Sequence, residues 1–232
     1  MAIPFYVAPD QMVQDKAEYA RKGIAKGKSL VAMEYRGGVS LITENPSASL
    51  NKISEIYDRI AFAGVGKYSE FENLRKAGIR YADLKGYAYS REDVSSKSLA
   101  NAYSEAIGNI FTREIKPLEV EILAVEVGET SEENQIFRIL FDGSISDHHG
   151  FVVIGGQSEK LSQFLRDRYA EELELAEAMK LGKEALEAGQ GGAIRESMLE
   201  VAILDRARPG RTFRRILAPE IRELLAKASL AS

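Results

Sequence analysis

Few residues of this 232-residue sequence have the types and spacing that chemistry requires. The only histidines, His148 and His149, are adjacent. Adjacent residues of an extended segment point to opposite faces, so the two rings are poorly spaced to share a metal ion. Acidic residues crowd positions 168–188, where they alternate with an apolar helical stripe, a pattern typical of a solvated helix face. We predict a solvated histidine loop and a solvated acidic helix, and we expect no metal site and no cofactor.

The sequence also lacks the motifs that identify several common enzymes and binding proteins. It has no GxxxxGK[ST] loop, no HExxH, no G-x-S-x-G and no GxGxxG after a strand. Cysteine is absent, which excludes disulfides and suits a reducing compartment. The 31 basic and 35 acidic residues give a net charge of -4, with no general attraction to nucleic acid. Without a signal sequence or a long apolar run, we expect a cytoplasmic protein with neither nucleic-acid nor membrane partners.

The elements that must position any site begin with a helix and a hairpin. Apolar residues at helical spacing predict a helix over residues 10–25, with Asp10 as its N-cap. The run "GKSLVAMEYRGGVSLITE", residues 27–44, is apolar on nearly every residue of two strands and turns at Arg36-Gly37-Gly38. Strands of this composition are expected to be buried on both faces.

The remaining elements are grouped in blocks. Two further strands precede two helices at 67–77 and 96–113. Three strands follow at 120–127, 136–141 and 151–154, then two helices, strands at 198–205 and 212–217, and a closing helix at 219–229. Segregated strands and helices favour antiparallel sheets with helices outside, which is an α+β fold. No low-complexity linker divides the chain, so we expect one domain over residues 1–232.

The hairpin, together with "AEYARKGIAKG" before it and "NKISEIYDRIAFAGVGKYSEF" and "FDGSISDHHGFVVIGG" after it, resembles the proteasome core particle alpha-type subunits of actinobacteria. The similarity runs from about Phe5 to Leu225. It implies a four-layer αββα sandwich of the N-terminal-nucleophile hydrolase type with an extra N-terminal helix. Residues 1–8 would then be a gate segment, 10–25 the extra helix and 28–228 the sandwich.

The resemblance also implies that the chain has no catalytic residues. In beta-type relatives, processing frees a threonine at the start of the hairpin, and its amine and hydroxyl act as base and nucleophile. Here Lys28 or Ser29 holds that place inside the chain. Glu44 and Lys52 match the acidic and lysine partners, whereas Gly156 replaces the helper serine. Without the nucleophile, the two matching residues indicate an inactive homologue.

Lys52 has another role in the alpha-type family. A lysine at this position pairs with the C-terminal carboxylate of an activator, in a pocket between neighbouring subunits. Arg21 and Gly66 match the same pocket more loosely. The resemblance implies a pore gate formed by the N-terminal segment, including Ile3, Pro4, Phe5 and Tyr6.

The function implied is that of a structural and gating subunit of a threonine-type endopeptidase complex. It would form outer heptameric rings with its ring mates, template assembly of the beta-type subunits, and dock a hexameric ring ATPase. Unfolded proteins tagged by pupylation would pass through it. Two alternatives stay open: an N-terminal-nucleophile hydrolase that cleaves itself before Ser29, and a single-ring proteasome-like assembly.

Overall fold

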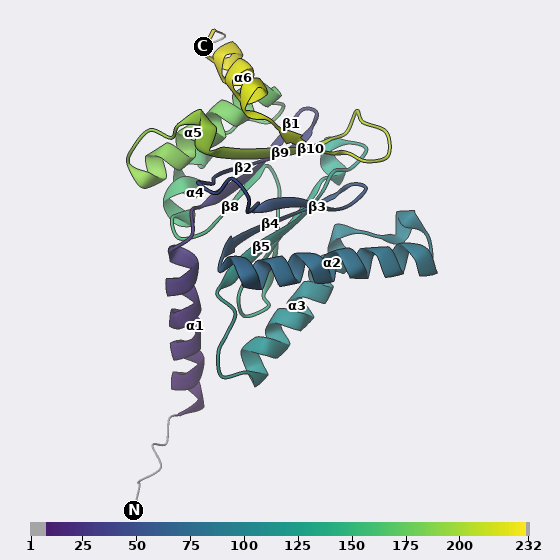
Figure 1. Ribbon diagram of the computed structural model, residues 1–232, viewed down its shortest axis with the longest axis vertical. Helices are drawn as coiled ribbons and strands as arrows, with labels where there is room; N and C mark the ends of the chain where they lie inside the picture. Colours follow the sequence, from purple (N-terminus) through teal and green to yellow (C-terminus); the bar gives the residue numbers. More distant parts are fainter. Residues whose placement is uncertain (1–7, 231–232) are drawn as a thin grey trace, which may run out of the picture.

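Two antiparallel sheets lie face to face between two layers of helices in the computed structural model, which describes residues 8–230 (Figure 1). The first sheet has the strand order β10-β9-β2-β1-β8 and is covered by α4, α5 and α6. The second has the order β3-β4-β5-β6-β7 and is covered by α2 and α3. The expected four-layer α+β sandwich is therefore confirmed.

The strands and helices have the following bounds. The strands are β1 (Leu30–Tyr35), β2 (Gly38–Glu44), β3 (Ile53–Tyr57), β4 (Ile60–Gly66), β5 (Val120–Glu126), β6 (Gln135–Ile139), β7 (Ile145–His148), β8 (Phe151–Ile154), β9 (Leu199–Asp205) and β10 (Phe213–Ile216). The α-helices are α1 (Pro9–Ala25), α2 (Tyr68–Ala88), α3 (Ser96–Arg113), α4 (Ser158–Arg166), α5 (Leu175–Gln190) and α6 (Ala218–Leu230).

The unusual composition of the β1–β2 hairpin follows from its place in the middle of a sheet that is covered on both faces. Along β1, Leu30 and Ala32 face the core between the sheets, whereas Val31 and Met33 face the helices of the outer layer. Successive strand residues alternate between faces, so a strand with two buried faces is apolar throughout. Antiparallel pairing opposes Leu30 to Thr43 and fixes the open end of the hairpin.

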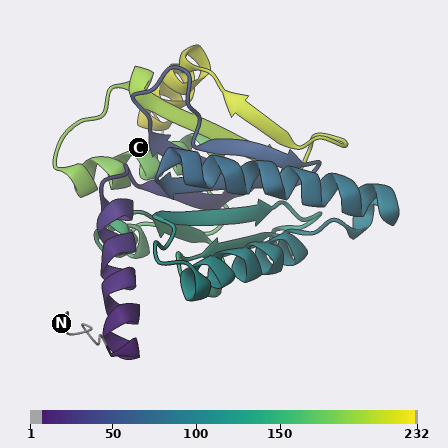
Figure 2. The ribbon, with the colours of Figure 1, turned by 60° about the horizontal axis from the view of Figure 1, so that its bottom comes forward.

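Helix α1 projects away from the sandwich in both ribbon views (Figures 1 and 2). Only Ala20 and Ile24 of its C-terminal half are buried, and both enter the core between the sheets. The ammonium of Lys16 donates hydrogen bonds to the carbonyl oxygens of Phe111 (3.0 Å) and Glu114 (2.7 Å), at the C-terminal end of α3. These carbonyls have no partner inside a helix, so Lys16 ties the two helices together.

The N-cap prediction for α1 is wrong by two residues. The helix begins at Pro9 with Ala8 as its N-cap, and Asp10 lies in the first turn. Proline suits the first helical position because its fixed φ is helical and no donor is lost there. The carboxylate of Asp10 remains favourably placed near the positive end of the helix dipole.

Two further predictions differ from the structure. The strand β7 was not predicted, because its residues are mostly exposed and it pairs on one side only, with β6. An edge strand of this kind has no apolar alternation to reveal it. Helix α2 continues to Ala88 instead of ending at residue 77. Its buried positions beyond residue 77 are the small residues Gly78 and Ala82, which give a weak apolar signal, and glycine is a poor helix former.

The two regions first considered for chemistry are only partly as predicted. His148 ends β7 and is partly buried, so the solvated histidine loop is wrong for His148 and correct for His149, which is exposed. Burial is the main cause that lowers the pKa of His148. The acidic run forms a helix from Leu175 onward, while residues 168–174 connect α4 to α5.

Within residues 8–230, no helix is long and apolar enough to cross a membrane.

Candidate functional site

The side chain of Lys52 lies at the open end of the β1–β2 hairpin, one residue before β3 begins. Its ammonium nitrogen Nζ donates hydrogen bonds to the carbonyl oxygens of Lys28 (3.0 Å) and Glu44 (3.3 Å). The hydroxyl oxygen of Thr43 lies 3.5 Å away. The two strand ends of the hairpin therefore surround the amine of a lysine that arrives from the next strand.

A second lysine at the same place is neutralised by a carboxylate. Nζ of Lys28 forms an ion pair with Oε2 of Glu44 at 2.8 Å and a hydrogen bond with Oε1 of Gln190 at 3.1 Å. Lys52 differs, because in the described part of the chain no carboxylate oxygen lies within 4.0 Å of its ammonium nitrogen. The positive charge of Lys52 is thus held by neutral oxygens only.

Burial lowers the pKa of Lys52 from its usual value near 10.5 to about 8. The carboxylates of Glu200 and Glu44 act against burial and favour the charged amine, whereas the ammonium of Lys28 adds to the lowering. A lysine with this pKa is mostly charged at neutral pH and becomes neutral in mildly alkaline solution. A nearby anion would stabilise its charged form.

The residue at the start of the hairpin, Ser29, is unsuited to nucleophilic catalysis in this setting. Its carbonyl accepts a hydrogen bond from the hydroxyl of Thr43 (2.8 Å), and its own hydroxyl accepts one from the backbone N–H of Gln157 (3.4 Å). Its nitrogen belongs to the peptide bond with Lys28, so it is no free amine that could act as a base.

Gly156, which stands where the resemblance expects a helper serine, lies against the last residue of α1. A Cβ placed on Gly156 would come within 2.7 Å of Cα of Ala25 and 3.0 Å of its carbonyl oxygen. The end of α1 therefore leaves no room for a serine side chain at this position.

Gly66 is the last residue of β4, the strand that pairs with β3. The backbone N–H of Gly64, two residues earlier, donates to the carbonyl oxygen of Lys52 at 3.0 Å. Gly66 has φ of +111°, and a Cβ there would lie 2.0 Å from the carbonyl oxygen of Glu119, so only glycine fits. A Cβ on Gly27 would come within 3.0 Å of the backbone nitrogen of Gly66, which places Gly66 beside the segment that carries Lys28.

Arg21 lies away from the Lys52 ammonium. Its guanidinium carbon is 5.6 Å from the ring centroid of Phe141. Its side chain lines a hollow of about 530 Å³ between α1 and the start of α4, and Lys52 does not line this hollow. The four gate positions Ile3, Pro4, Phe5 and Tyr6 lie outside the described residues. The structure thus places Gly66 beside the segment that binds the Lys52 ammonium, whereas Arg21 lies beside Phe141.

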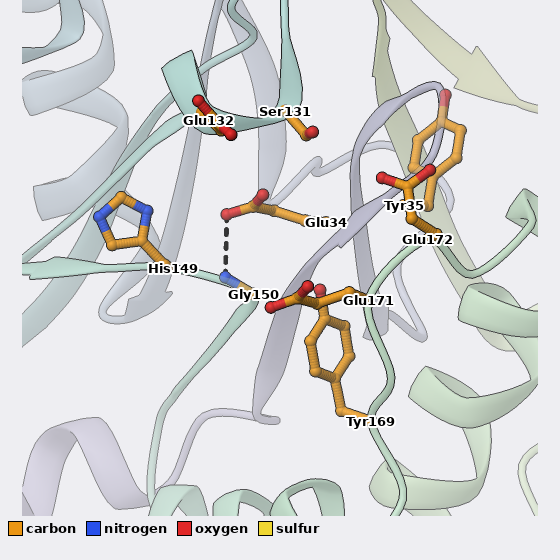
Figure 3. Close-up of a pocket in the computed structure, with 9 residues that line it drawn as sticks. All are labelled: Glu34, Tyr35, Ser131, Glu132, His149, Gly150, Tyr169, Glu171 and Glu172. Carbon is orange, nitrogen blue, oxygen red and sulfur yellow. Dashed lines mark hydrogen bonds between the residues drawn. The ribbon is translucent and has the colours of Figure 1, made fainter.

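Figure 3 shows another hollow, of about 530 Å³, at the far end of β1. Glu34 lies at its centre, where its carboxylate accepts a hydrogen bond from the backbone N–H of Gly150 at 2.9 Å. The carboxylates of Glu132, Glu171 and Glu172 line the hollow with Glu34. Across residues 8–230, no group of three potential ligands is arranged to hold a metal ion.

Sequence analysis missed one residue that belongs to the Lys52 site. Glu200 lies in β9, is only 8% exposed and accepts a hydrogen bond from the backbone N–H of Lys52 at 3.0 Å. The sequence contains a signal for this role. Glu200 is an acidic residue near the start of the apolar run "LEVAILD", and a carboxylate that is buried in a strand requires hydrogen-bond partners.

An αββα sandwich with an added N-terminal helix places the chain in the class of proteins with the N-terminal-nucleophile hydrolase fold. The family model described as "Proteasome subunit" matches residues 24–204. The chain belongs to the proteasome subunit family.

Curated relatives from several actinobacteria agree with this assignment. The chain is 54% identical to "Proteasome subunit alpha" of Sanguibacter keddieii, over 97% of this chain and 90% of that protein. It is 52% identical to the protein of the same name from Thermomonospora curvata, over 99% and 100% of the two chains. For the Thermobifida fusca protein of that name the identity is 48%, over 98% and 92%. These names support the non-catalytic alpha-type role.

Proposed function

We propose that this chain forms the outer heptameric rings of a proteasome core, templates assembly of the beta-type rings and controls entry of substrates. The family assignment supports a subunit of this complex. The surroundings of Ser29 and Gly156 support a role without catalysis, because Ser29 has no free amine of its own and Gly156 supplies no helper serine. Residues 1–232 would act as one domain in the cytoplasm.

The docking role of Lys52 is the more specific part of the proposal. The observation that carries it is the ammonium of Lys52, which is bonded to carbonyl and hydroxyl oxygens and to no carboxylate among the described residues. A partly buried cation without an ionic partner gains most from an added carboxylate, because the pair is poorly screened by solvent. A C-terminal carboxylate of a hexameric ring ATPase would supply it.

Gly66 supports the same role through its position, because its backbone nitrogen lies beside Gly27, the residue before Lys28. The place of Arg21 in the activator pocket and the gate formed by Ile3, Pro4, Phe5 and Tyr6 remain predictions. In this proposal, unfolded substrates tagged with the prokaryotic ubiquitin-like modifier are delivered by the ATPase. They then pass the gate on the way to the beta-type rings.

One preparation tests the assembly proposal. The chain is mixed with a beta-type subunit from the same genome, and native mass and peptidase rate are measured on the same sample. A four-ring particle that gains activity only on mixing supports the proposal. Peptide cleavage by the chain alone would instead support a hydrolase cleaved before Ser29, and loss of 28 residues from the intact mass would confirm that cleavage.

A further inference from the structure

The carboxylate of Glu200 is one of the most fully bonded side chains of this structure. Each of its two oxygens accepts two hydrogen bonds. The donors are the backbone N–H of Ile53 (3.0 Å) and Nη1 of Arg215 (2.8 Å) at Oε1, and the backbone N–H of Lys52 (3.0 Å) and Nδ2 of Asn45 (2.6 Å) at Oε2. This number of donors satisfies the desolvated carboxylate of a residue that is 8% exposed.

These contacts connect the two sheets at the point where Lys52 enters the second sheet. Glu200 lies in β9 of one sheet, whereas Ile53 begins β3 of the other and Lys52 directly precedes it. Arg215 in β10 also donates from Nη2 to the carbonyl oxygen of Ile53 at 2.7 Å. Three backbone atoms at the start of β3 are thus fixed by one ion pair from the opposite sheet.

Asn45 extends the arrangement into the loop between β2 and β3. Its side-chain amide nitrogen donates both to Glu200 and to the carbonyl oxygen of Leu50 at 2.6 Å. Its amide oxygen accepts from the backbone N–H of Ser47 at 3.0 Å. The loop that delivers Lys52 to the hairpin is therefore ordered by the same carboxylate.

Glu200 acts on the amine of Lys52 as well as on its backbone. Its negative charge is the largest of the influences that favour the charged amine against burial. No hydrogen bond joins the carboxylate of Glu200 to Nζ of Lys52, so the carboxylate does not compete directly with an incoming anion. Glu200 can thus support the cation and leave it available.

We propose that Glu200, held by Arg215, is a positioning residue: it fixes the position in which the Lys52 ammonium binds the carboxylate of an activator. The inference rests on the proposed docking role of Lys52. In this inference Glu200, which is buried in β9 and does not touch the activator, contributes to the docking affinity.

The test uses assembled core particles and a synthetic peptide of the last ten residues of the ring ATPase from the same genome, with a free C-terminal carboxylate. Affinities are compared for wild type, Glu200→Gln, Lys52→Met and the double variant. We expect Glu200→Gln to weaken binding roughly fivefold, and to have no further effect in the Lys52→Met background, because residues that act through one another are not additive. Glu220→Gln is the matched control, since Glu220 pairs with Arg214 on the same side of the sandwich and no hydrogen bond joins it to Lys52.

Two results would overturn the inference. One is an unchanged affinity in Glu200→Gln particles when Lys52→Met weakens binding. The other is an equal loss from Glu200→Gln in both backgrounds, which would indicate a general effect on the fold. If Glu200→Gln particles fail to assemble, Asn45→Ala enters the same cycle, with an expected loss of about twofold that disappears in the Lys52→Met background.

A second readout separates this inference from the docking proposal. If Lys52→Met leaves peptide affinity unchanged, the docking role itself is wrong. Titration of the Lys52 amine, followed by NMR after reductive ¹³C-methylation of the particle, then decides the positioning role alone. We expect Glu200→Gln to lower the pKa of that amine and Glu220→Gln to leave it unchanged; equal titration curves would exclude Glu200 as a positioning residue.

Discussion

Gly156 and Ala25 lie so close together that a Cβ on Gly156 would come within 2.7 Å of the Cα of Ala25. The contact joins the end of α1 to the segment that follows β8. In this chain the added N-terminal helix therefore occupies the space that a helper serine would need. The position of α1 and the glycine at residue 156 are therefore two aspects of one packing arrangement.

Gly156→Ser should reduce the stability of the chain without creating activity. Overpacking at a contact of this kind costs about 1–3 kcal/mol, and the missing nucleophile is not restored by a serine at this place. Urea unfolding measures the cost, and the peptidase rate of the assembled particle should equal that of wild type. Gly192→Ser is the control: no atom lies within 4 Å of a Cβ there, so its effect should stay below about 0.5 kcal/mol. Equal stabilities of the two variants would contradict the close packing of α1.

Binding of the activator peptide should depend on the pKa of Lys52, which is about 8. The charged amine binds a carboxylate and the neutral amine does not, so affinity is expected to fall as the pH rises through this value. The bound carboxylate itself favours the charged form, so the midpoint in the complex lies above 8. Fluorescence anisotropy between about pH 6.5 and 9.5 measures the curve.

Lys52→Arg supplies the control for that titration. A guanidinium stays charged throughout the pH range, so any affinity that this variant retains should not depend on pH. Lys52→Met should bind roughly tenfold more weakly than wild type at neutral pH and should also show no pH dependence. A wild-type affinity that is constant across the range would mean that the Lys52 amine does not bind the carboxylate.

The ion pair of Glu121 with Arg138 should matter more for stability than an exposed pair. Glu121 is 3% exposed and also accepts a hydrogen bond from the backbone N–H of Gly155 at 2.9 Å. Burial raises the pKa of Glu121, and Arg138 opposes that change. Arg138→Met would leave the carboxylate buried without a cation and should cost about 3–5 kcal/mol in urea unfolding.

Arg211→Met is the matched control for this measurement. Arg211 pairs with Glu55, but its side chain is 71% exposed, so its removal should cost less than about 1 kcal/mol. Comparable losses from the two variants would indicate that the Glu121 carboxylate finds other partners or takes up a proton.

Deletion of residues 2–8 should speed peptide hydrolysis by the assembled particle, if these apolar residues close the pore together. A short apolar segment that one subunit cannot bury favours contact with its ring mates. The rate is measured with a small fluorogenic peptide on particles of equal beta-type content. Removal of residues 231–232 is the control and should leave the rate unchanged. An unaltered rate in the first variant would disprove the gate.

The sequence alone predicts the order of the elements, apart from β7, and an α+β fold with helices outside antiparallel sheets. The apolar hairpin at residues 27–44 and the helical spacing at 96–113 are local patterns, and the structure confirms both. Such patterns are readable because side chains repeat every two residues in strands and every 3.6 in helices. Where the local pattern was weak, as in the exposed edge strand β7 and the glycine-containing end of α2, the prediction failed.

Tertiary structure alone decided the surroundings of Lys52. The sequence singled out this lysine, but its carbonyl partners come from the two ends of the hairpin and its supporting carboxylate, Glu200, is 148 residues away. Burial and the charges of Glu200, Glu44 and Lys28 set the pKa of the amine. These influences depend on distance in space, and contacts between residues far apart in the chain leave no periodic signal in the sequence. For the same reason, only the folded chain shows that Arg21 lies beside Phe141 and that Gly66 lies beside Gly27.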